Sequence, residues 1–544
     1  MTTSASENGG AGTTADASAP GTTDPVAPAP AAPAPATAPV VAASAATAPV
    51  VVAPATAGSV TPPPGTPAPL RDLVVVGAGA AGLAGAVVAA ELGLSVALLD
   101  SSTQPGGQFY RHPAPALGAV RPEALHHDWS AFTDLRRRLA GSGAEHLTGH
   151  HVWSVAREPD GTWTAHALTG ADGADEAPVR IRARALLLAT GAYERQLPFP
   201  GWTLPGVVGA GGAQAMLKSG LVLPGRRVVV AGSGPLLLAV ASSLAAAGAR
   251  VPAVVEAAGY LRYARTPRAL AANPHKAVEA LTHGAALVRH RVPVRARSAV
   301  TEVHGTDRVE AVTVSRLDRD WRPLPGTGRR IVCDALAVGH GLVPQIELAT
   351  AVGCATRALP DGTLGLALDE SQESSVPGLW AAGETGGVGG AELARTEGEL
   401  AGRTIAARLL GRRTGGPAVG ALRRRRDRMR AFADVMSAAH APGPGWTGWL
   451  TDTTDVCRCE EVPAGRVREA VDELGARDAR TVKLLTRAGM GWCQGRMCGT
   501  AVACLAARGG APEPPAERRP LAVPVPLSAL AALDAPAEPP PVTR

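Results

Sequence analysis

The chain has 544 residues, of which 46% are hydrophobic and 18% charged, and its formal net charge is +6. Three or four domains of ordinary size fit this length, and seven cysteines without a secretion signal indicate a reducing cytoplasm rather than a disulfide framework. The small positive charge does not indicate a nucleic-acid-binding protein. Acidic residues are spread throughout, aromatic residues are only 3%, and no recognition motif is present.

The two ends of the chain differ in composition from the rest. Residues 1–70 are almost entirely Ala, Pro, Thr, Val, Ser and Gly, and the first basic side chain is Arg71. Secretory and twin-arginine signals begin with basic residues, so neither is expected. We predict a disordered tail over 1–70 and a Pro-rich extension over 511–544, because neither segment can bury a core.

Two apolar runs, 73–90 and 228–249, lack charges over a length that could span a membrane. Each begins with a strand-like segment, is interrupted by glycines and continues as an Ala- and Leu-rich helix. A buried strand–turn–helix produces the same hydropathy, so both runs predict βαβ units and no transmembrane helix.

The first run carries a dinucleotide-binding motif. Gly77, Gly79 and Gly82 have G-x-G-x-x-G spacing, directly after a strand and at the start of a helix. Gly77 permits the tight turn, Gly79 lets the backbone approach a pyrophosphate, and Gly82 lets the helix pack close to the strand. The next strand ends at Asp100, whose carboxylate can bind both hydroxyls of an adenosine ribose.

Three later segments favour FAD as this dinucleotide. A Gly-Gly pair follows the ribose-binding acid, and a strand ending in Ala-Thr-Gly at 189–191 suits a turn that passes the cofactor. A third strand, 379–382, ends in Gly-Glu before a glycine-rich helix start, where a carboxylate can accept a hydrogen bond from a ribityl hydroxyl. The predicted FAD contacts in these segments are Gly106, Gly107, Thr190, Gly191, Gly383 and Glu384.

The second run carries a degenerate version of the motif. Gly232 and Gly234 match the first two glycines, but Leu237 stands at the third position, so the helix cannot pack as closely. The next strand ends at Glu256, and an acid there favours a ribose diol over a 2′-phosphate. The ligand is therefore NAD rather than NADP if a nicotinamide binds; another adenine nucleotide, or no ligand, remains open.

No C-x-x-C pair lies within 100–430, so the flavin is not expected to pass electrons to a disulfide. The isolated Cys333, Cys354 and Cys504 are predicted to be packing residues. Four polar side chains could lie near the flavin, but each is more often a packing or surface residue than a general base, so no catalytic residue is assigned. These four are Tyr110, His112, Tyr193 and His340.

The remaining four cysteines form two close pairs, Cys457 with Cys459 and Cys493 with Cys498. Helix-like stretches between the pairs can bring the four thiolates together. C-x-C is tight for two ligands of one zinc ion, whereas a [2Fe–2S] cluster accepts this spacing. We favour the cluster as the metal site, with zinc and unrelated structural thiols as alternatives.

The residues around these cysteines suit a cluster. Backbone N–H groups of Gly491, Gly495 and Gly499 could donate to the sulfurs and tune the reduction potential. Arg458 and Arg496 could offset the negative charge of the cluster.

These motifs divide the chain into an α/β fold with two Rossmann-like domains and a small helical domain. The FAD-binding domain comprises 71–200 and 331–412 and flanks a second dinucleotide-binding domain, 201–330. A helical linker, 413–451, leads to a [2Fe–2S] domain over 452–510. The linker contains LRRRRDRMR at 422–430, which we interpret as a solvated helix face rather than a binding patch.

The motifs VCRCEEV, TRAGMGWCQGRMCG and DSSTQPGGQFYR, with GETGGVGGAELARTEGELAG, resemble one family. It comprises FAD subunits of bacterial amino-acid and amine dehydrogenases with a fused iron–sulfur module of the bacterioferritin-associated ferredoxin type. Its members include the corresponding subunits of hydrogen cyanide synthase, of opine oxidase, and of proline and hydroxyproline dehydrogenases. The resemblance covers about residues 72–530 and implies a glutathione-reductase-like architecture.

The resemblance also implies a function and partners. An amine or amino acid would give hydride to a flavin, and electrons would leave through FAD and the [2Fe–2S] cluster to an external acceptor. We expect a partner FAD subunit of the D-amino-acid-oxidase type and a small ferredoxin-like subunit, in the cytoplasm or at a membrane through a quinone-linked acceptor. The alternatives are an NAD(P)H-dependent reductase and a non-catalytic electron-transfer subunit.

Overall fold

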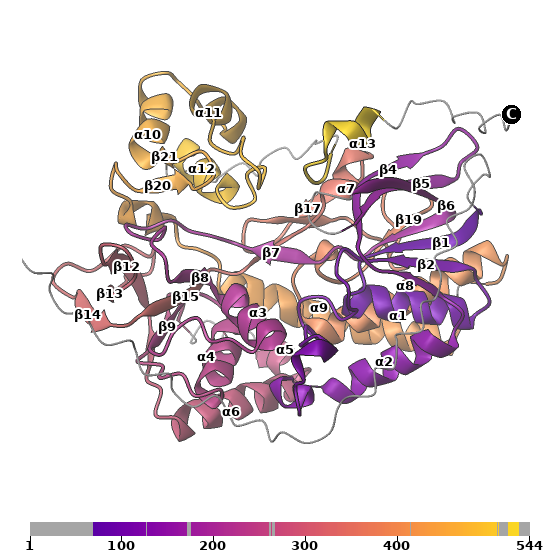
Figure 1. The fold of residues 1–544 in the computed structure, drawn as a ribbon, viewed down its shortest axis with the longest axis horizontal. Coiled ribbons are helices and arrows are strands. Elements are labelled where there is room, and N and C mark those ends of the chain that lie inside the picture. Colours follow the sequence, from indigo (N-terminus) through magenta and orange to yellow (C-terminus); the bar gives the residue numbers. More distant parts are fainter. Residues whose placement is uncertain are drawn as a thin grey trace, which may run out of the picture. The chain divides into compact units, whose positions relative to one another are not determined.

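The computed structural model of the chain describes residues 69–126, 128–170, 176–259, 263, 267–413, 415–508, 510 and 521–531 (Figure 1). The predicted tail over 1–70 lies almost wholly outside these residues, as does most of the extension over 511–544. Within the described ranges, no helix is both long and apolar enough to cross a membrane. The two apolar runs instead form a strand, a turn and a helix each, as predicted.

The first apolar run belongs to a seven-stranded sheet in the order β3-β2-β1-β6-β5-β4, with β19 also pairing with β6. The five strands nearest the glycine motif are parallel, while β4 and β5 are antiparallel additions at one edge. Strand bounds are β1 Arg71–Val76, β2 Val96–Leu99, β3 Glu145–Leu147, β4 His150–Arg157, β5 Trp163–Thr169, β6 Ala177–Leu188 and β19 Leu379–Ala381.

One face of this sheet is covered by α1 (Ala80–Glu91), α2 (Trp129–Gly141) and α8 (Ala391–Leu409) (Figure 1). The helices α1 and α8 pack backbone to backbone because glycines line their contact. A Cβ on Gly398 would lie 2.0 Å from the carbonyl oxygen of Ala81, and one on Gly402 would lie 2.6 Å from that of Gly85. No sequence motif predicted a role for these two glycines of α8.

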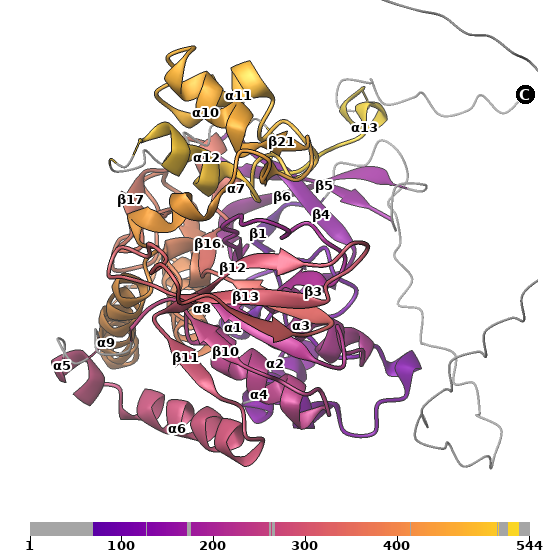
Figure 2. The same ribbon diagram turned by 90° about the vertical axis from the view of Figure 1, so that its left-hand side faces the viewer.

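The second apolar run belongs to a five-stranded parallel sheet in the order β11-β10-β9-β15-β8. Helices α3, α4 and α6 share a core with one face, and a three-stranded antiparallel sheet shares a core with the other (Figure 2). The bounds are β8 Val207–Gly209, α3 Ala210–Gly220, β9 Val228–Gly232, α4 Leu236–Ala246, β10 Val254–Glu256, α5 Pro267–Ala271, α6 Pro274–Arg289, β11 Val294–Ala296, β12 Ser298–His304, β13 Ala311–Arg316, β14 Arg329–Val332 and β15 Ala335–Gly339.

A two-stranded antiparallel ribbon, β7 (Ala192–Glu194) with β16 (Leu342–Pro344), carries the chain between the two sheets (Figure 1). Shorter elements complete this part of the chain. They are the 3₁₀ turns Pro115–Leu117, Pro122–Leu125 and η4 Gly383–Gly386, helix α7 Glu347–Ala351, and the hairpin of β17 Thr356–Ala358 with β18 Leu364–Leu366.

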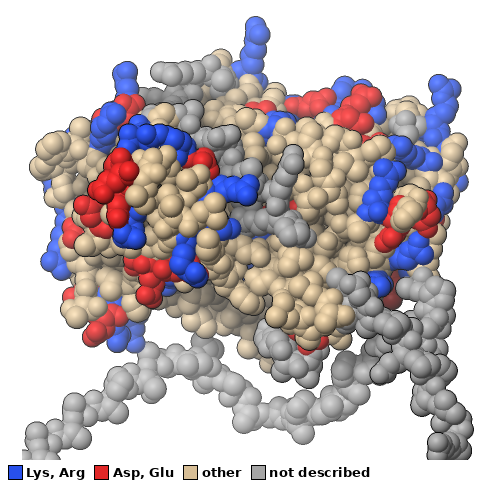
Figure 3. Space-filling view, turned by 90° about the horizontal axis from the view of Figure 1, so that it is seen from above, with Lys and Arg blue, Asp and Glu red and all other residues tan. Residues whose placement is uncertain are grey.

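The basic run of the linker lies on α9 (Pro417–Ala439), and its interpretation as a solvated helix face is wrong for two of its arginines. Arg430 is largely buried, pairs with Glu397 and donates to the carbonyl of Gly387. Arg426 donates to the side-chain oxygen of Gln372 at 2.7 Å. These contacts fasten α9 to the first sheet's helical layer. Elsewhere, basic and acidic side chains are interspersed on the face shown in Figure 3.

The C-terminal module contains the 3₁₀ segment η5 (Pro444–Trp449), the ribbon β20 (Asp455–Cys457) and β21 (Val462–Pro463), and helices α10 (Ala464–Asp472), α11 (Ala479–Thr486) and α12 (Gly499–Ala506). Its core is continuous with that of the second sheet. The Trp202 indole donates to the carbonyl of Asp455 at 2.7 Å, and the Trp449 indole donates to that of Trp321 at 2.9 Å. Beyond it, α13 (Leu527–Ala531) packs against β4 and β5.

Candidate cofactor and cluster sites

The first glycine loop is built so that only glycine fits two of its positions. Gly77 has φ +102°, and a Cβ there would lie 2.4 Å from the carbonyl oxygen of Ala189. A Cβ on Gly82 would lie 1.7 Å from the carbonyl oxygen of Gly77. The start of α1 therefore packs closely against the end of β1. In this arrangement the N–H groups of the first helical turn can face a phosphate.

Three segments far apart in the sequence meet the first turn of α1. The amide of Gly106 donates to the carbonyl of Ala78 at 2.8 Å, which holds the Gly106–Gly107 pair against the loop. The backbone just after β6, at Ala189, lies against Gly77, and Gly383 lies beside Ala81. The surroundings of Gly79 are thus mainly backbone, without bulky side chains, and this cradle fits the pyrophosphate of a dinucleotide.

Asp100 lies at the end of β2, as predicted, and its carboxylate turns toward the same loop. It accepts hydrogen bonds from the amide of Ala78 at 2.5 Å and from that of Ser102 at 2.7 Å. A carboxylate has about four acceptor positions, so two remain for the hydroxyls of a ribose.

The other predicted FAD residues lie at strand ends beside this loop. The hydroxyl of Thr190 donates to the carbonyl of Gln345 at 2.6 Å, and Gly191 has φ +79° with open space where a Cβ would stand. Glu384 accepts from the amides of Gly389 at 2.7 Å and Gly390 at 3.1 Å. Burial raises the pKa of Glu384 above its ordinary value despite these donors.

The second glycine loop has a different environment. Gly232 has φ +135°, and a Cβ there would lie 1.7 Å from the carbonyl oxygen of Gly339, whereas the space beside Gly234 is open. Glu256 is completely buried and accepts from the amides of Gly234 at 3.0 Å and Ala258 at 2.8 Å. Glu256 therefore accepts two loop amides as Asp100 does, but unlike Asp100 it is completely buried.

A histidine from the linker closes this second loop. His440, at the end of α9, places Nδ1 3.4 Å from Glu256 and 3.2 Å from the hydroxyl of Ser233. Its Nε2 lies 2.9 Å from the hydroxyl of Tyr263. A nucleotide could reach Glu256 only if these side chains moved.

The four polar candidates named from the sequence do not converge on one site. Tyr110 is fully buried, stacks on Phe132 and accepts a hydrogen bond from Arg395 at 3.3 Å. His112 contacts the carbonyl of Tyr110 at 2.9 Å. Burial lowers the pKa of His340 to about 3, so it is neutral, and Tyr193 lines a cavity beside β7.

Lys218 of α3 is a buried cation that no sequence pattern predicted. Its Nζ donates to the carbonyl of Phe109 at 3.2 Å, directly beside the Gly106–Gly107 loop, and burial lowers its pKa to about 8. A single lysine in an amphipathic helix gives no sequence signal of burial, because only the approach of Phe109 from another segment encloses it.

The C-terminal module brings the four predicted metal ligands together as two pairs. The Cys457 and Cys498 thiols are hydrogen-bonded to each other, as are those of Cys459 and Cys493. The hydrogen bond from Cys498, followed by backbone N–H groups, lowers the pKa of Cys457 to about 6. Cys457 and Cys498 are buried, while Cys459 is exposed.

The donor set of this module is four cysteine thiols, arranged as two pairs. Two contacting thiol pairs match a centre in which each of two irons takes two cysteine ligands.

The loops around the cysteines differ in part from the expectation. The amide of Gly489, which was not predicted, donates to Cys457 Sγ at 3.4 Å, while that of Gly499 donates to the carbonyl of Gly495 at 2.6 Å. A Cβ on Gly491 would lie 2.3 Å from the Cβ of Cys459, so this glycine lets the two ligand loops approach.

Arg496, which was predicted to offset the charge of a cluster, has partners in other segments of the chain. Its Nε lies 2.9 Å from Glu347 of α7, and its other nitrogens donate to backbone carbonyls that include that of Ala522. The arginine therefore ties the cluster loop to the rest of the chain. Cys504 packs partly buried against the shared core, as expected.

Comparison with known proteins gives two matches along the chain. Residues 71–398 match the family described as pyridine nucleotide-disulphide oxidoreductase, and residues 456–508 match the BFD-like [2Fe-2S] binding domain. Both predicted Rossmann units lie inside the first match, and all four paired cysteines lie inside the second.

Two curated relatives align with most of their own length. The chain is 36% identical over 430 residues to the HcnB protein of hydrogen cyanide synthase from Pseudomonas aeruginosa, covering 78% of this chain and 90% of that protein. It is 35% identical over 456 residues to the A subunit of opine oxidase from Rhizobium meliloti, covering 80% and 92%.

Among solved structures, L-proline dehydrogenase from P. horikoshii is similar in fold, with a TM-score of 0.60 at 20% sequence identity. The match covers 85% of this chain and 79% of that one. At this identity, the similarity concerns the arrangement of the elements.

Proposed function

Because this chain belongs to the pyridine nucleotide-disulphide oxidoreductase family and carries a BFD-like [2Fe-2S] binding domain, we propose that it is the flavin- and iron–sulfur-containing subunit of an amino-acid or imino-acid dehydrogenase. The family membership confirms the resemblance identified in the sequence. The observation that carries the proposal is that two contacting thiol pairs share one compact unit with a glycine cradle of the FAD type.

In this proposal the cradle at the start of α1 holds FAD. Gly77, Gly79 and Gly82 bring backbone N–H groups to the pyrophosphate, and Asp100 accepts from the ribose hydroxyls. Glu384 accepts from the ribityl chain with the lone pairs that Gly389 and Gly390 leave free. Bound FAD would supply two-electron oxidation of a C–N bond and one-electron transfer onward.

The four cysteines would hold the cluster as two neighbouring pairs, Cys457 with Cys498 and Cys459 with Cys493. The N–H group of Gly489 donates to a ligand sulfur and would stabilise added negative charge there. The buried pair lies on the side of the shared core, and Cys459 lies at the surface, so the site has an inner and an outer face.

The names of the relatives support a multi-subunit enzyme. The matched proteins of hydrogen cyanide synthase and of opine oxidase are both described as subunits. We propose that this chain assembles with a partner FAD subunit of the D-amino-acid-oxidase type and with a small ferredoxin-like subunit. We also propose the domain boundaries predicted from the sequence, and a location in the cytoplasm, where thiols stay reduced.

A role as an NAD(P)H-dependent reductase has less support. The acid that would bind the nicotinamide dinucleotide's ribose is Glu256, which is fully buried and held by Gly234, Ala258 and His440. The second unit therefore serves better as a packing platform for the C-terminal module, whose core it shares.

The proposal is tested by measuring FAD, iron and acid-labile sulfide in the purified full chain. We expect about one FAD and about two irons and two sulfides per chain. Cys457→Ser should remove most of the iron and sulfide, while Cys354→Ser, a matched change at a buried cysteine outside the site, should leave them unchanged. A chain that binds FAD but neither iron nor sulfide after anaerobic reconstitution contradicts the proposal.

A further inference from the structure

The side chain of Arg496 joins the cluster loop, which lies between α11 and α12, to segments outside the C-terminal module. Its Nε lies 2.9 Å from Oε1 of Glu347 at the start of α7, and its Nη2 donates to the carbonyl of Ala522. Its Nη1 donates to the carbonyl of Cys493 at 3.4 Å, within the cluster loop itself. One guanidinium group therefore contacts both the backbone of a proposed cluster ligand and a carboxylate of the FAD-binding domain.

Glu347 and Arg496 form a buried ion pair. The side chain of Glu347 is 4% exposed and that of Arg496 is 16% exposed, so water and salt screen their attraction only weakly. Leu348 and Ala349, which follow Glu347 in α7, belong to a core shared with strands of the first sheet. The pair therefore connects the cluster loop to the packed interior of the FAD-binding domain.

The backbone just before Glu347 continues this connection to the Ala-Thr-Gly turn after β6, which is assigned to FAD and which we call the flavin turn. The carbonyl of Gln345 accepts a hydrogen bond from the hydroxyl of Thr190 at 2.6 Å. The amide of Gln345 donates to the carbonyl of Gly191 at 2.9 Å. Gln345 stands only two residues before Glu347 in the chain. A continuous series of contacts therefore runs from the cluster loop, through one ion pair, to the flavin turn.

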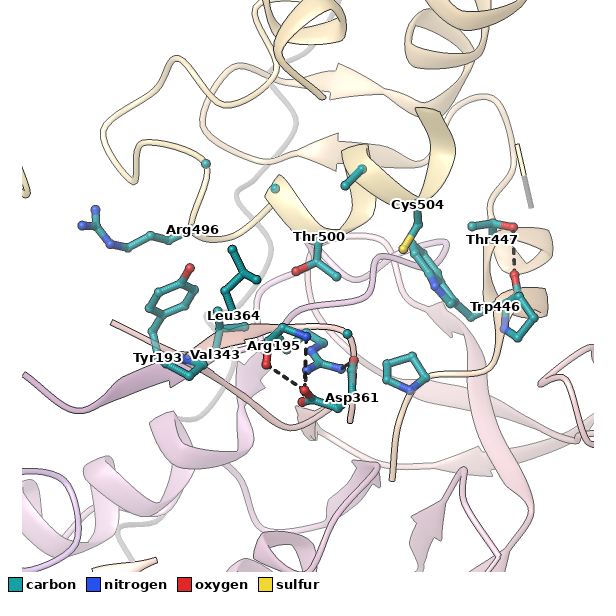
Figure 4. A pocket seen from close by; sticks show the side chains of 18 of the residues that line it. Tyr193, Arg195, Val343, Asp361, Leu364, Trp446, Thr447, Arg496, Thr500 and Cys504 are labelled. Carbon is teal, nitrogen blue, oxygen red and sulfur yellow. Dashed lines mark hydrogen bonds and ion pairs between the residues drawn. The ribbon is translucent and has the colours of Figure 1, made fainter. Parts of the chain in front are cut away.

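The ion pair also borders a cavity of about 400 Å³ between the C-terminal module and the β7–β16 ribbon (Figure 4). Tyr193 of β7 lines this cavity together with the two charged side chains, and Figure 4 shows Arg496 between Tyr193 and the cluster loop. Side chains on opposite sides of a cavity make no van der Waals contact across it. The ion pair therefore contributes a larger share of what holds the two sides at a fixed separation.

We propose that Arg496 and Glu347 are positioning residues for electron transfer, because they hold the cluster loop at a fixed separation from the flavin turn. The inference rests on the proposed function, which places FAD at the turn and a [2Fe–2S] cluster on the loop. The ion pair itself is neither oxidised nor reduced. Its loss acts on the separation of the two sites, on which the rate of electron transfer depends steeply.

Amide hydrogen exchange of the full chain tests whether the two ends of this connection are coupled, and it needs neither FAD nor iron. The amide of Arg496, bonded to the carbonyl of Cys493 at 3.1 Å, reports on the cluster loop, and that of Gln345 reports on the flavin turn. Arg496→Gln should speed exchange at Gln345, and Glu347→Gln should speed exchange at Arg496. Each change should be at least about tenfold, because a hydrogen bond between two charged groups is lost.

The matched control for exchange is Glu469→Gln, the same substitution in an acid that pairs with Arg466 within α10 of the same module. It should change exchange at neither amide. Each single variant leaves one buried charge unpaired, so the double variant of Glu347→Gln with Arg496→Gln should exchange faster than the unaltered chain but no faster than either single variant. Unchanged exchange at Gln345 in both Arg496→Gln and the double variant overturns the proposal.

The positioning role is tested in the loaded chain by flash reduction of the flavin, followed by the optical bleaching of the cluster. In this step one electron passes from the reduced flavin to the oxidised cluster, and no other group changes its oxidation state. Glu347→Gln should slow the step about 2- to 30-fold, with the contents of FAD, iron and sulfide and the electron paramagnetic resonance spectrum of the reduced cluster unchanged. Arg496→Lys, which keeps a cation beside Glu347, should retain more of the rate than Arg496→Gln.

The two experiments separate the ion pair from the proposed function. Absence of iron and sulfide from the unaltered chain after anaerobic reconstitution would count against the proposed function. Equal transfer rates in Glu347→Gln and Glu469→Gln, with iron and FAD present in both, would overturn the positioning role and leave the proposed function intact.

Discussion

The two glycine loops of this chain begin alike and end in different environments. In both, a strand runs into a glycine with positive φ, and an acid at the end of the next strand accepts an amide of the loop. Around the first loop stand the backbones of Gly107 and Gly383, whereas His440 and Tyr263 stand at the second. A loop walled by backbone admits a ligand, while side chains already take up the hydrogen-bonding capacity of the other.

The helices that follow the loops differ for a related reason. Gly82 lets α1 begin at Ala80, tight against the turn, and α1 then packs backbone to backbone on α8. At the matching position of the second loop stands Leu237, and α4 begins at Leu236, two residues after Gly234 rather than one after Gly79. The leucine is buried in the core beneath α3 and α6, so it stabilises the second unit without shaping an anion site.

The largest expected difference between the loops comes from Gly82→Ala. The new Cβ would lie 1.7 Å from a backbone oxygen that cannot move without displacing β1, so the free energy of unfolding should fall by at least about 3 kcal/mol. Gly234→Ala meets open space and pays only for its positive φ of +123°, about 1–2 kcal/mol. Urea denaturation of both variants measures the difference between their free energies of unfolding. Equal decreases for the two variants would contradict the difference proposed between the two loops.

A smaller effect is expected when each acid is replaced by its amide. Asp100→Asn should weaken FAD binding by about 2 kcal/mol, or about 30-fold in the dissociation constant, because a charged acceptor for the ribose hydroxyls becomes neutral. Glu256→Gln should leave FAD binding unchanged. The measurement is flavin fluorescence during titration of the apoprotein with FAD. Loss of FAD from Glu256→Gln alone would reverse the assignment of the two loops.

The smallest expected effect comes from His440→Ala. Removing its hydrogen bonds to Ser233 and Tyr263 should lower stability by about 1 kcal/mol and open the way to Glu256. Binding of adenine nucleotides, measured by calorimetry with NADH and ATP, should then strengthen relative to the unaltered chain. His275→Ala, a partly exposed histidine that pairs with Glu392 on α8, is the control and should change neither nucleotide's affinity. Tighter nucleotide binding by the unaltered chain than by His440→Ala would show that the histidine is a ligand contact rather than a barrier.

The sequence by itself determined the elements that depend on local spacing. Glycines at fixed intervals after an apolar strand, with an acid ending the next strand, predicted both Rossmann units, and four cysteines in two pairs predicted a cluster site. The prediction of the Rossmann units succeeds because a turn with positive φ and a close helix approach permit only glycine. The prediction of an iron–sulfur domain agrees with the BFD-like family match, because cysteine ligands of such a cluster occur in short loops.

Only the tertiary structure decided which groups from distant segments meet. The closure of the second loop by His440, the burial of Arg430 and Lys218, and the pairing of Arg496 with Glu347 each join residues more than 30 positions apart. The sequence separation between the two residues of each pair follows no regular pattern, because hydrogen bonds and ion pairs depend on position in space rather than in the chain. For the same reason the cavity lined by the β7–β16 ribbon, the segment before η5 and the start of α12 (Figure 4) leaves no pattern in the sequence.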